Sequence, residues 1–241
     1  MIFMPLGAWI AEHWGWRVAL ILSGVGLLAI LMLFQLLGKE RPQDLGLGQT
    51  ASTRLVFWVL ALTFFICGLS SYGLTATHFV PFCGDLGFPL VTSASFLAMI
   101  GVFDLFGTIG SGWLSDRYDN RLLLALYYGF RGLSLVWIVQ SGASFVAMSA
   151  FAVLYGLDFI ATVPPTVRLT VGGFGRELGP VVFGWIFAAH QIGVGLMAFV
   201  AGASRDELGT YVPAFLAAGL LCLLAAAAFG LVKKPVQAVP A

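Results

Sequence analysis

Four ionisable side chains lie inside long apolar stretches of the sequence, at Asp104, Arg131, Asp158 and His190. A charge at the centre of a lipid bilayer costs about 2.5 to 3.5 kcal/mol on insertion scales, so such a group needs a partner or a function. Carboxylate, guanidinium and imidazole groups are also the ones that bind protons and anionic solutes. These four residues are therefore our candidates for a substrate or proton pathway.

Asp104 and Arg131 are predicted to lie at the same depth on consecutive helices. Asp104 is twelve residues before Asp116, and Arg131 is ten residues after Arg121. At about 1.5 Å per residue, both lie roughly 15 to 18 Å from the connection between the helices. We expect the two charges to interact, directly or through water, and to titrate or exchange partners when substrate or proton binds. The alternative is a buried pair that fixes helix packing without touching substrate.

His190 and Asp158 each have two interpretations. His190 lies near the middle of an apolar stretch, where an imidazole would suit a proton relay; a hydrogen bond to a neighbouring helix is the alternative. Asp158 lies six residues before Pro164, in the predicted cytoplasmic third of its helix. It is a candidate to gate the pathway or to bind a proton, and the alternative is that it caps a helix end disrupted by proline.

Membrane-spanning helices must position these side chains. Hydrophobic residues make up 60% of the 241 residues and charged residues only 10%, with a mean hydropathy of +0.98. That is more apolar surface than a soluble domain of this size can bury, so lipid is the expected solvent. About 20 apolar residues are needed for a helix to cross the bilayer core. The sequence predicts an all-α integral membrane bundle with spans at 17–37, 56–80, 90–113, 122–139, 144–164, 180–202 and 211–232, and a partial span at 1–11.

The distribution of Lys and Arg predicts the orientation of these spans, because cations are retained on the cytoplasmic side. Alternate connections divide the cations into a group of two, Arg17 and Arg205, and a group of nine. The nine are Lys39, Arg41, Arg54, Arg117, Arg121, Arg168, Arg176, Lys233 and Lys234. We therefore expect a multi-pass protein of the cell membrane with a cytoplasmic C-terminus.

Several function classes lack sequence support. The net charge of +1 gives no basic field for nucleic acid. The three cysteines match no zinc or redox spacing and are interpreted as small buried hydrophobes, so neither a metal nor a cofactor is expected. The sequence has no phosphate-binding nucleotide loop, no zinc-protease motif and no serine-hydrolase elbow. An enzyme is therefore not expected.

The connection between spans 90–113 and 122–139 carries a recognisable motif. Residues 112–121 read GWLSDRYDNR. This loop resembles the signature G-x-L-A-D-R-x-G-R-R or K of the major facilitator superfamily, with matches at Gly112, Asp116, Arg117 and Arg121. Asp119 stands where the family usually has glycine, and the next residue is asparagine instead of a basic residue.

The resemblance implies that this loop latches one conformation of a transport cycle. On physical grounds, Gly112 would permit close helix approach and Asp116 would accept hydrogen bonds or face a helix N-terminus. Arg117 and Arg121 would anchor the loop on the cytoplasmic side. The family carries the signature after helices 2 and 8 of twelve, and four predicted spans follow it here.

Counting from the motif gives the expected domain organisation. Residues 1–37 would be the remainder of an N-terminal bundle, comprising the end of helix 5 and helix 6. Residues 38–54 would form a cytoplasmic linker, 55–232 a C-terminal six-helix bundle and 233–241 a cytoplasmic tail. In this interpretation most of the N-terminal bundle is missing from the chain.

Further similarity is to the bacterial monocarboxylate-transporter-like branch of the superfamily. It rests on Gly15-Trp16-Arg17, on the segment 41–46 and on the segment 103–107. Transporters of this type carry an acidic residue followed four positions later by arginine, a partner for a substrate carboxylate. Here Asp104 keeps the acid but Thr108 replaces the arginine, so Arg131 is a candidate to supply the cation.

The expected function is secondary transport of a small organic solute such as a carboxylate, by alternating access with proton coupling or exchange. The alternative is a non-transporting membrane fragment, or a scaffold or partner subunit, that lacks the N-terminal bundle. Small residues should let helices pack closely in either case. Gly107 with Ser111, Ala198 with Gly202, and Gly193 and Gly195 are the positions that the spacing favours.

Overall fold

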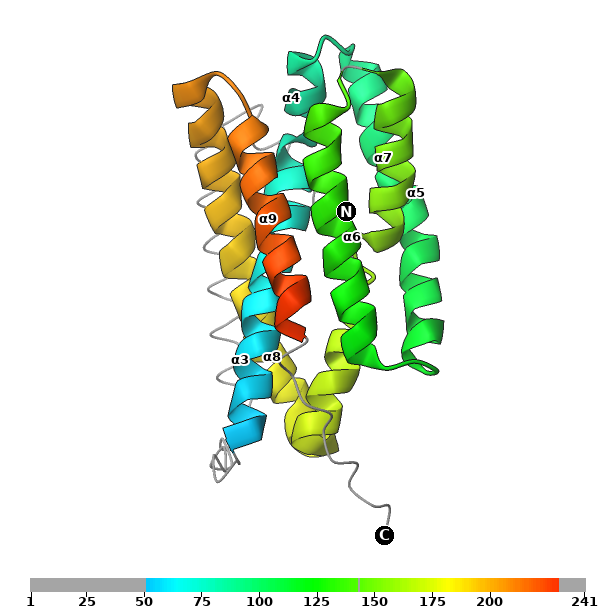
Figure 1. Ribbon diagram of the computed structural model, residues 1–241, viewed down its shortest axis with the longest axis vertical. Coiled ribbons are helices and arrows are strands. Elements are labelled where there is room, and N and C mark those ends of the chain that lie inside the picture. Colours follow the sequence, from blue (N-terminus) through cyan, green and yellow to red (C-terminus); the bar gives the residue numbers. More distant parts are fainter. Residues whose placement is uncertain (1–50, 143, 230–241) are drawn as a thin grey trace, which may run out of the picture. The chain divides into compact units, whose positions relative to one another are not determined.

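The computed structural model describes residues 51–142 and 144–229, and within these residues the chain is helical with no strand. Figure 1 shows the described helices side by side as rods that alternate in direction. They are α3 (Ala51–Gly68), the π-helix η1 (Leu69–Ala76), α4 (Thr77–Asp85), α5 (Leu90–Ser115), α6 (Asn120–Gln140), α7 (Phe145–Asp158), α8 (Val163–Leu208) and α9 (Val212–Ala228). The predicted spans 1–11 and 17–37, the tail 233–241 and most of the linker 38–54 lie outside the described residues.

Four described helical segments are long and apolar enough to cross a membrane: Arg54–Asp85, Leu90–Ser115, Asn120–Gln140 and Phe145–Leu208. The last has 64 residues, which at about 1.5 Å each would extend roughly three times the thickness of the hydrocarbon core. It reverses direction at Gly175, whose φ of 80° is a backbone conformation that glycine adopts readily. The segment therefore provides two passes, and the predicted all-α membrane fold class is confirmed.

The predicted span 144–164 is interrupted. α7 ends at Asp158, and the four residues 159–162 separate it from α8. We call these four residues the break. Pro164 and Pro165 lie in the first turn of α8, where their missing N–H groups leave no hydrogen bond unmade. The residue that precedes α8 is Thr162, so the alternative that Asp158 caps this helix is wrong.

Glycine pairs bring three pairs of helices into backbone contact. α3 meets α8 at Gly68 and Gly193, where an added Cβ would collide with the carbonyl oxygens of His190 and Phe65. α5 meets α7 where Gly107 faces the backbone of Leu157 and Gly156 faces that of Ile100, and α6 meets α9 at Gly132 and Gly219. Such crossings are typical of membrane helices, which lack a hydrophobic drive to associate and depend on close packing.

The expectation of close packing is confirmed at Gly107 and Gly193 and wrong at Gly112 and Gly195. A Cβ added to Gly112 or Gly195 would meet no heavy atom within 4 Å in the described part of the chain. Gly112 is half-buried and Gly195 is exposed. The spacing of small residues alone did not distinguish the face that meets a neighbouring helix.

An ion pair joins neighbouring segments at each end of the rods. Arg168 of α8 pairs with Asp116 at the α5–α6 connection, close to the end where α8 reverses. At the other end, Arg205 donates to both carboxylate oxygens of Asp85, at 2.6 and 2.9 Å. Both pairs lie at the ends of the bundle and are partly exposed. The ion pair in its middle, described next, is buried.

Candidate functional site

The break between α7 and α8 lies about halfway along the rods, where a continuous helix would be expected (Figure 1). Ending a helix inside a membrane leaves backbone groups without helical partners, and lipid cannot satisfy them. Three helices supply side chains for these groups. The break is therefore a defined structure built from polar contacts.

Arg131 of α6 holds the α7 side of the break. Its Nε donates to Asp158 Oδ2 at 2.7 Å, and its Nη2 donates to the carbonyl oxygens of Asp158 and Phe159 at 2.5 and 3.0 Å. Its Nη1 contacts Cys67 Sγ at 3.0 Å and Ser70 Oγ at 3.5 Å. These contacts match the five N–H donors of a guanidinium. Arg131 is fully buried, with 0% of its surface exposed.

Asp104 of α5 holds the opposite side. Its Oδ1 accepts the amide hydrogen of Ile160 at 3.0 Å and the hydroxyl hydrogen of Thr108 at 3.2 Å. The ion-pair partner of Arg131 is Asp158, not Asp104, so the predicted direct pair is wrong. Both residues bind the same four-residue break instead. The two residues therefore reach the same level of the bundle, but they form no direct ion pair with each other.

Two further side chains complete the contacts of the break. Ser111 of α5 donates to the carbonyl oxygen of Ala161 at 2.5 Å, and Cys67 Sγ lies 3.3 Å from the hydroxyl of Thr162. Each of the four residues of the break therefore has a polar contact with a side chain from another helix. The neighbouring Asp158 keeps one carboxylate oxygen, Oδ1, buried without a hydrogen-bond partner among the described residues.

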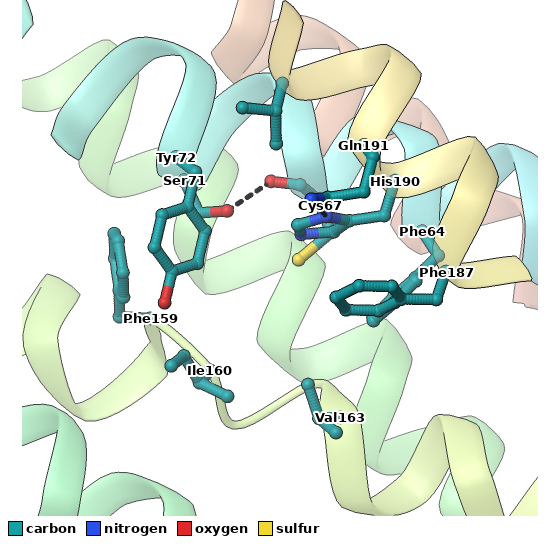
Figure 2. Close-up of a pocket in the computed structure, with 11 residues that line it drawn as sticks. Phe64, Cys67, Ser71, Tyr72, Phe159, Ile160, Val163, Phe187, His190 and Gln191 are labelled. Carbon is teal, nitrogen blue, oxygen red and sulfur yellow. Dashed lines mark hydrogen bonds between the residues drawn. The ribbon is translucent and has the colours of Figure 1, made fainter. Parts of the chain in front are cut away.

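A cavity of about 300 Å³ lies against the break (Figure 2). This volume is at the lower end of the roughly 300 to 1,000 Å³ typical of small-molecule sites. Figure 2 shows Tyr72 and Phe159 on one side of the cavity and Phe64, Phe187 and His190 on the other. Its remaining lining residues are Cys67, Ser71, Ile160, Val163, Gln191 and Val194.

The π-helix η1 places polar groups along the cavity wall and behind it. Ser70 accepts from Tyr155 Oη through its carbonyl oxygen at 2.7 Å, and Ser71 Oγ donates to the carbonyl oxygen of Cys67 at 2.6 Å. A π-helical turn widens the helix by one residue and frees backbone groups for side-chain contacts. Tyr72, within this turn, presents its ring to the cavity next to Phe159, with centroids 5.2 Å apart.

His190 lies in the cavity wall. Its Nδ1 is 3.1 Å from Gln191 Oε1, and its ring stacks on Phe187 with centroids 5.4 Å apart and planes 7° apart. Phe64 packs against the same ring at 4.9 Å. Of the four predicted candidates, His190 is the one on the cavity wall, while Arg131 and Asp158 lie behind it and Asp104 holds the break.

The predicted loop motif forms a separate cluster. Arg117 lies over the ring of Trp113 at 4.1 Å, and Arg121 donates to both carboxylate oxygens of Asp119. Asp119 also accepts from the backbone amide of Arg121, which makes it the N-cap of α6. This capping role gives the aspartate a physical reason to stand where the family pattern has glycine.

Two parts of the site were missed in the sequence. Cys67 was interpreted as a small buried hydrophobe, yet its sulfur contacts Arg131 and lines the cavity. The four aromatic side chains of the cavity were not assigned to a site. The polar run from Ser70 to Thr75 inside an otherwise apolar span was the available signal, because such groups need partners within the bundle.

Comparison with known proteins gives consistent matches. The family model for the Major Facilitator Superfamily matches residues 1–179. Monocarboxylate transporter 13 of Rattus norvegicus is 28% identical over 232 residues, covering 92% of this chain and 53% of the relative. The uncharacterized MFS-type transporter YcxA of Bacillus subtilis is 23% identical over 229 residues, covering 88% of this chain and 55% of the relative. The chain spans about half the length of these curated relatives.

Proposed function

This chain belongs to the Major Facilitator Superfamily, and on that premise we propose that it takes part in secondary transport of a small organic anion across a membrane. The observation that carries the proposal is the cavity at the break between α7 and α8. It combines apolar aromatic walls with a few converging polar groups, which is the usual composition of a small-molecule site. Interrupted helices near the middle of a bilayer are also where secondary transporters bind their solutes.

The carboxylate class of solute is part of this proposal. Four of the curated relatives are named monocarboxylate transporters, among them those from Rattus norvegicus and Danio rerio. A carboxylate needs hydrogen-bond donors and benefits from a nearby cation. The cavity offers the Gln191 amide and the His190 ring, whereas the Ser71 hydroxyl already donates to the carbonyl oxygen of Cys67. Coupling to protons or exchange would follow from titration of a group in or beside this cavity.

The remaining candidates receive supporting roles. Arg131, Asp158 and Asp104 hold the shape of the break, and Phe159 and Ile160 of the break form part of the cavity wall. The loop pair of Asp116 with Arg168 favours one conformation during the transport cycle. A second bundle, contributed by an N-terminal region, would close the cavity from the other side and allow alternating access.

The orientation follows from the charges. Arg54, Arg117, Arg121, Arg168 and Arg176 belong to helix ends or connections at one end of the rods, and Arg205 to the other. We propose that the cation-rich end faces the cytoplasm of a cell and that the C-terminus is cytoplasmic, as the distribution of Lys and Arg in the sequence favours.

Uptake by the protein produced from its complete gene tests the proposal. Proteoliposomes should accumulate at least one radiolabelled monocarboxylate, from a panel of aliphatic and aromatic acids with matched amides, faster than protein-free liposomes. An inward proton gradient should increase that rate if protons are coupled. Equal uptake by both kinds of liposome for every compound would reject the proposal.

A further inference from the structure

The cavity requires a cationic group if its solute is an anion, and Arg131 is not available for that role. All five of its donors are used by Asp158, Phe159, Cys67 and Ser70, and its side chain lies behind the cavity wall. A solute carboxylate would have to displace several buried protein contacts to reach the guanidinium. The expectation that Arg131 replaces the missing arginine of α5 therefore fails on geometry.

Among the described side chains of the cavity wall, His190 is the one that can carry a positive charge. Gln191 Oε1 can only accept a hydrogen bond, so the Nδ1 atom facing it carries hydrogen in the neutral ring. The other ring nitrogen, Nε2, is then the atom that gains the proton. Protonation makes the ring a donor with a positive charge, which suits a carboxylate.

The aromatic side chains next to His190 would stabilise a protonated imidazole. The rings of Phe187 and Phe64 pack against the imidazole at 5.4 and 4.9 Å, and aromatic faces attract cations. The titratable groups that face His190 are the Cys67 thiol from α3 and the Tyr72 phenol from η1. Arg131 lies behind Cys67.

The nearest acidic groups lie off this wall. Asp104 accepts a hydrogen bond from the backbone amide of Ile160 in the break, and Asp158 is paired with Arg131. Among the described residues that line the cavity, none is a carboxylate. An anion that reaches His190 therefore meets no carboxylate among the described residues of the wall.

The shape of the cavity restricts the rest of the solute. Tyr72 and Phe159 form one side and Phe64 and Phe187 the other, as Figure 2 shows. Flat rings stack favourably between aromatic side chains, whereas a saturated ring of similar size makes poorer contacts with them. The cavity volume of about 300 Å³ leaves room for one small aromatic molecule beside the imidazole.

From these observations, and resting on the proposed transport function, we infer that His190 is the proton-dependent anion-binding residue of the cavity. The solute it selects is a small aromatic monocarboxylate, bound with its carboxylate at His190 and its ring between the aromatic walls. Binding of the anion and binding of the proton are then linked. Each strengthens the other by the same factor.

Equilibrium binding of three probes tests this inference on the complete gene product in detergent. Benzoate is the aromatic anion, cyclohexanecarboxylate its saturated match and benzamide its neutral match. The affinity for benzoate should fall by about tenfold or more between pH 6 and pH 8, because the ring loses its proton while benzoate stays ionised. At pH 6, cyclohexanecarboxylate and benzamide should each bind several-fold more weakly than benzoate.

Two histidine variants provide the matched comparison. His190→Gln should weaken benzoate binding at pH 6 by about tenfold and remove the dependence on pH. His78→Gln is the control, because His78 contacts the carbonyl oxygen of Ala198 at 2.9 Å and does not line the cavity. It should bind benzoate as the unmodified protein does. Persistence of the full pH dependence in His190→Gln would overturn the inference.

A second measurement covers the case in which His190→Gln does not fold. Titration calorimetry of the unmodified protein with benzoate, in two buffers of different ionisation enthalpy, counts the protons taken up on binding. Uptake should approach one proton at pH 8 and fall towards zero at pH 5.5. No proton uptake at pH 8, or benzamide binding as tightly as benzoate at pH 6, would overturn the inference.

Uptake into proteoliposomes separates this inference from the proposed function. If benzoate binds in the predicted pH-dependent way but never crosses the bilayer, the transport proposal fails and the assignment of His190 stands. If another carboxylate of the panel is transported and benzoate does not bind, the transport proposal stands and the assignment of His190 with an aromatic solute is rejected.

Discussion

Asp104 and Arg131 meet at the break between α7 and α8, where each binds the backbone of the break rather than the charge of the other. The carboxylate accepts from the amide of Ile160, and the guanidinium donates to the carbonyl oxygens of Asp158 and Phe159. Two helices thus replace the hydrogen bonds that the interrupted helix lacks. This arrangement keeps a bent, non-helical segment stable within an apolar bundle and beside a cavity.

Removing the guanidinium should destabilise the bundle strongly. Arg131→Met would leave the buried Asp158 carboxylate and two carbonyl oxygens without their donor, and breaking a buried ion pair typically costs about 3 to 5 kcal/mol. Thermal unfolding in detergent measures the loss. Arg205→Gln is the control, because its pair with Asp85 is partly exposed and screened by solvent, so its loss should change stability little. Equal losses in the two variants would contradict this account of the break.

The role of Asp104 depends on an acceptor atom and not on a charge. Asp104→Asn retains an oxygen that can accept from the Ile160 amide, whereas Asp104→Leu leaves that amide unpaired at a cost of about 1 to 3 kcal/mol. We therefore expect the Asn variant to unfold close to the temperature of the unmodified protein and the Leu variant well below it. An Asn variant as unstable as the Leu variant would show that the charge itself is required.

Close contact between α3 and α8 predicts that Gly193 tolerates no side chain. Gly193→Val would place carbon atoms against the carbonyl oxygen of Phe65 and force the helices apart, which costs at least about 1 to 3 kcal/mol. Gly195→Val on the same helix makes the same change in helix propensity but meets open space among the described residues. Thermal unfolding should separate the two variants. If both lose the same stability, the contact is not what constrains Gly193.

The ion pair between Asp116 and Arg168 should affect the transport cycle more than stability. Both side chains are about half exposed, at 51% and 53%, so Asp116→Asn should change the unfolding free energy by less than about 1 kcal/mol. We expect it to change the rate of uptake while benzoate affinity stays the same. The exchange Asp116→Arg with Arg168→Asp should restore the rate. An altered affinity in Asp116→Asn would argue against a conformational role.

The sequence predicted the helical membrane class, the positions of most spans and the residues that carry buried charge. These follow from hydropathy and from the cost of charge in lipid, which are local properties of the chain. The partner of Arg131 did not follow, because equal depth on two helices does not say which faces meet. Asp158 was placed near a helix end, but its contact with Arg131 across 27 residues depends on how α7 ends.

The break and the cavity were harder to predict for the same reason. Pro164 and Pro165 suggested a disrupted helix end, yet they begin α8, and the interruption precedes them. Cys67 gave no signal of its own, since a thiol is compatible with an apolar core. Its role arises from two distant residues, Arg131 and His190, that packing brings to its sulfur.

Counterflow of radiolabelled benzoate in proteoliposomes tests most directly whether solute crosses the membrane through the cavity at the break. Vesicles loaded with unlabelled benzoate should transiently accumulate the label when they contain the unmodified protein. Val194→Trp, which fills the cavity from α8, should abolish this accumulation while its unfolding temperature stays close to that of the unmodified protein. Counterflow by Val194→Trp at the unmodified rate, or none by the unmodified protein, would contradict the account.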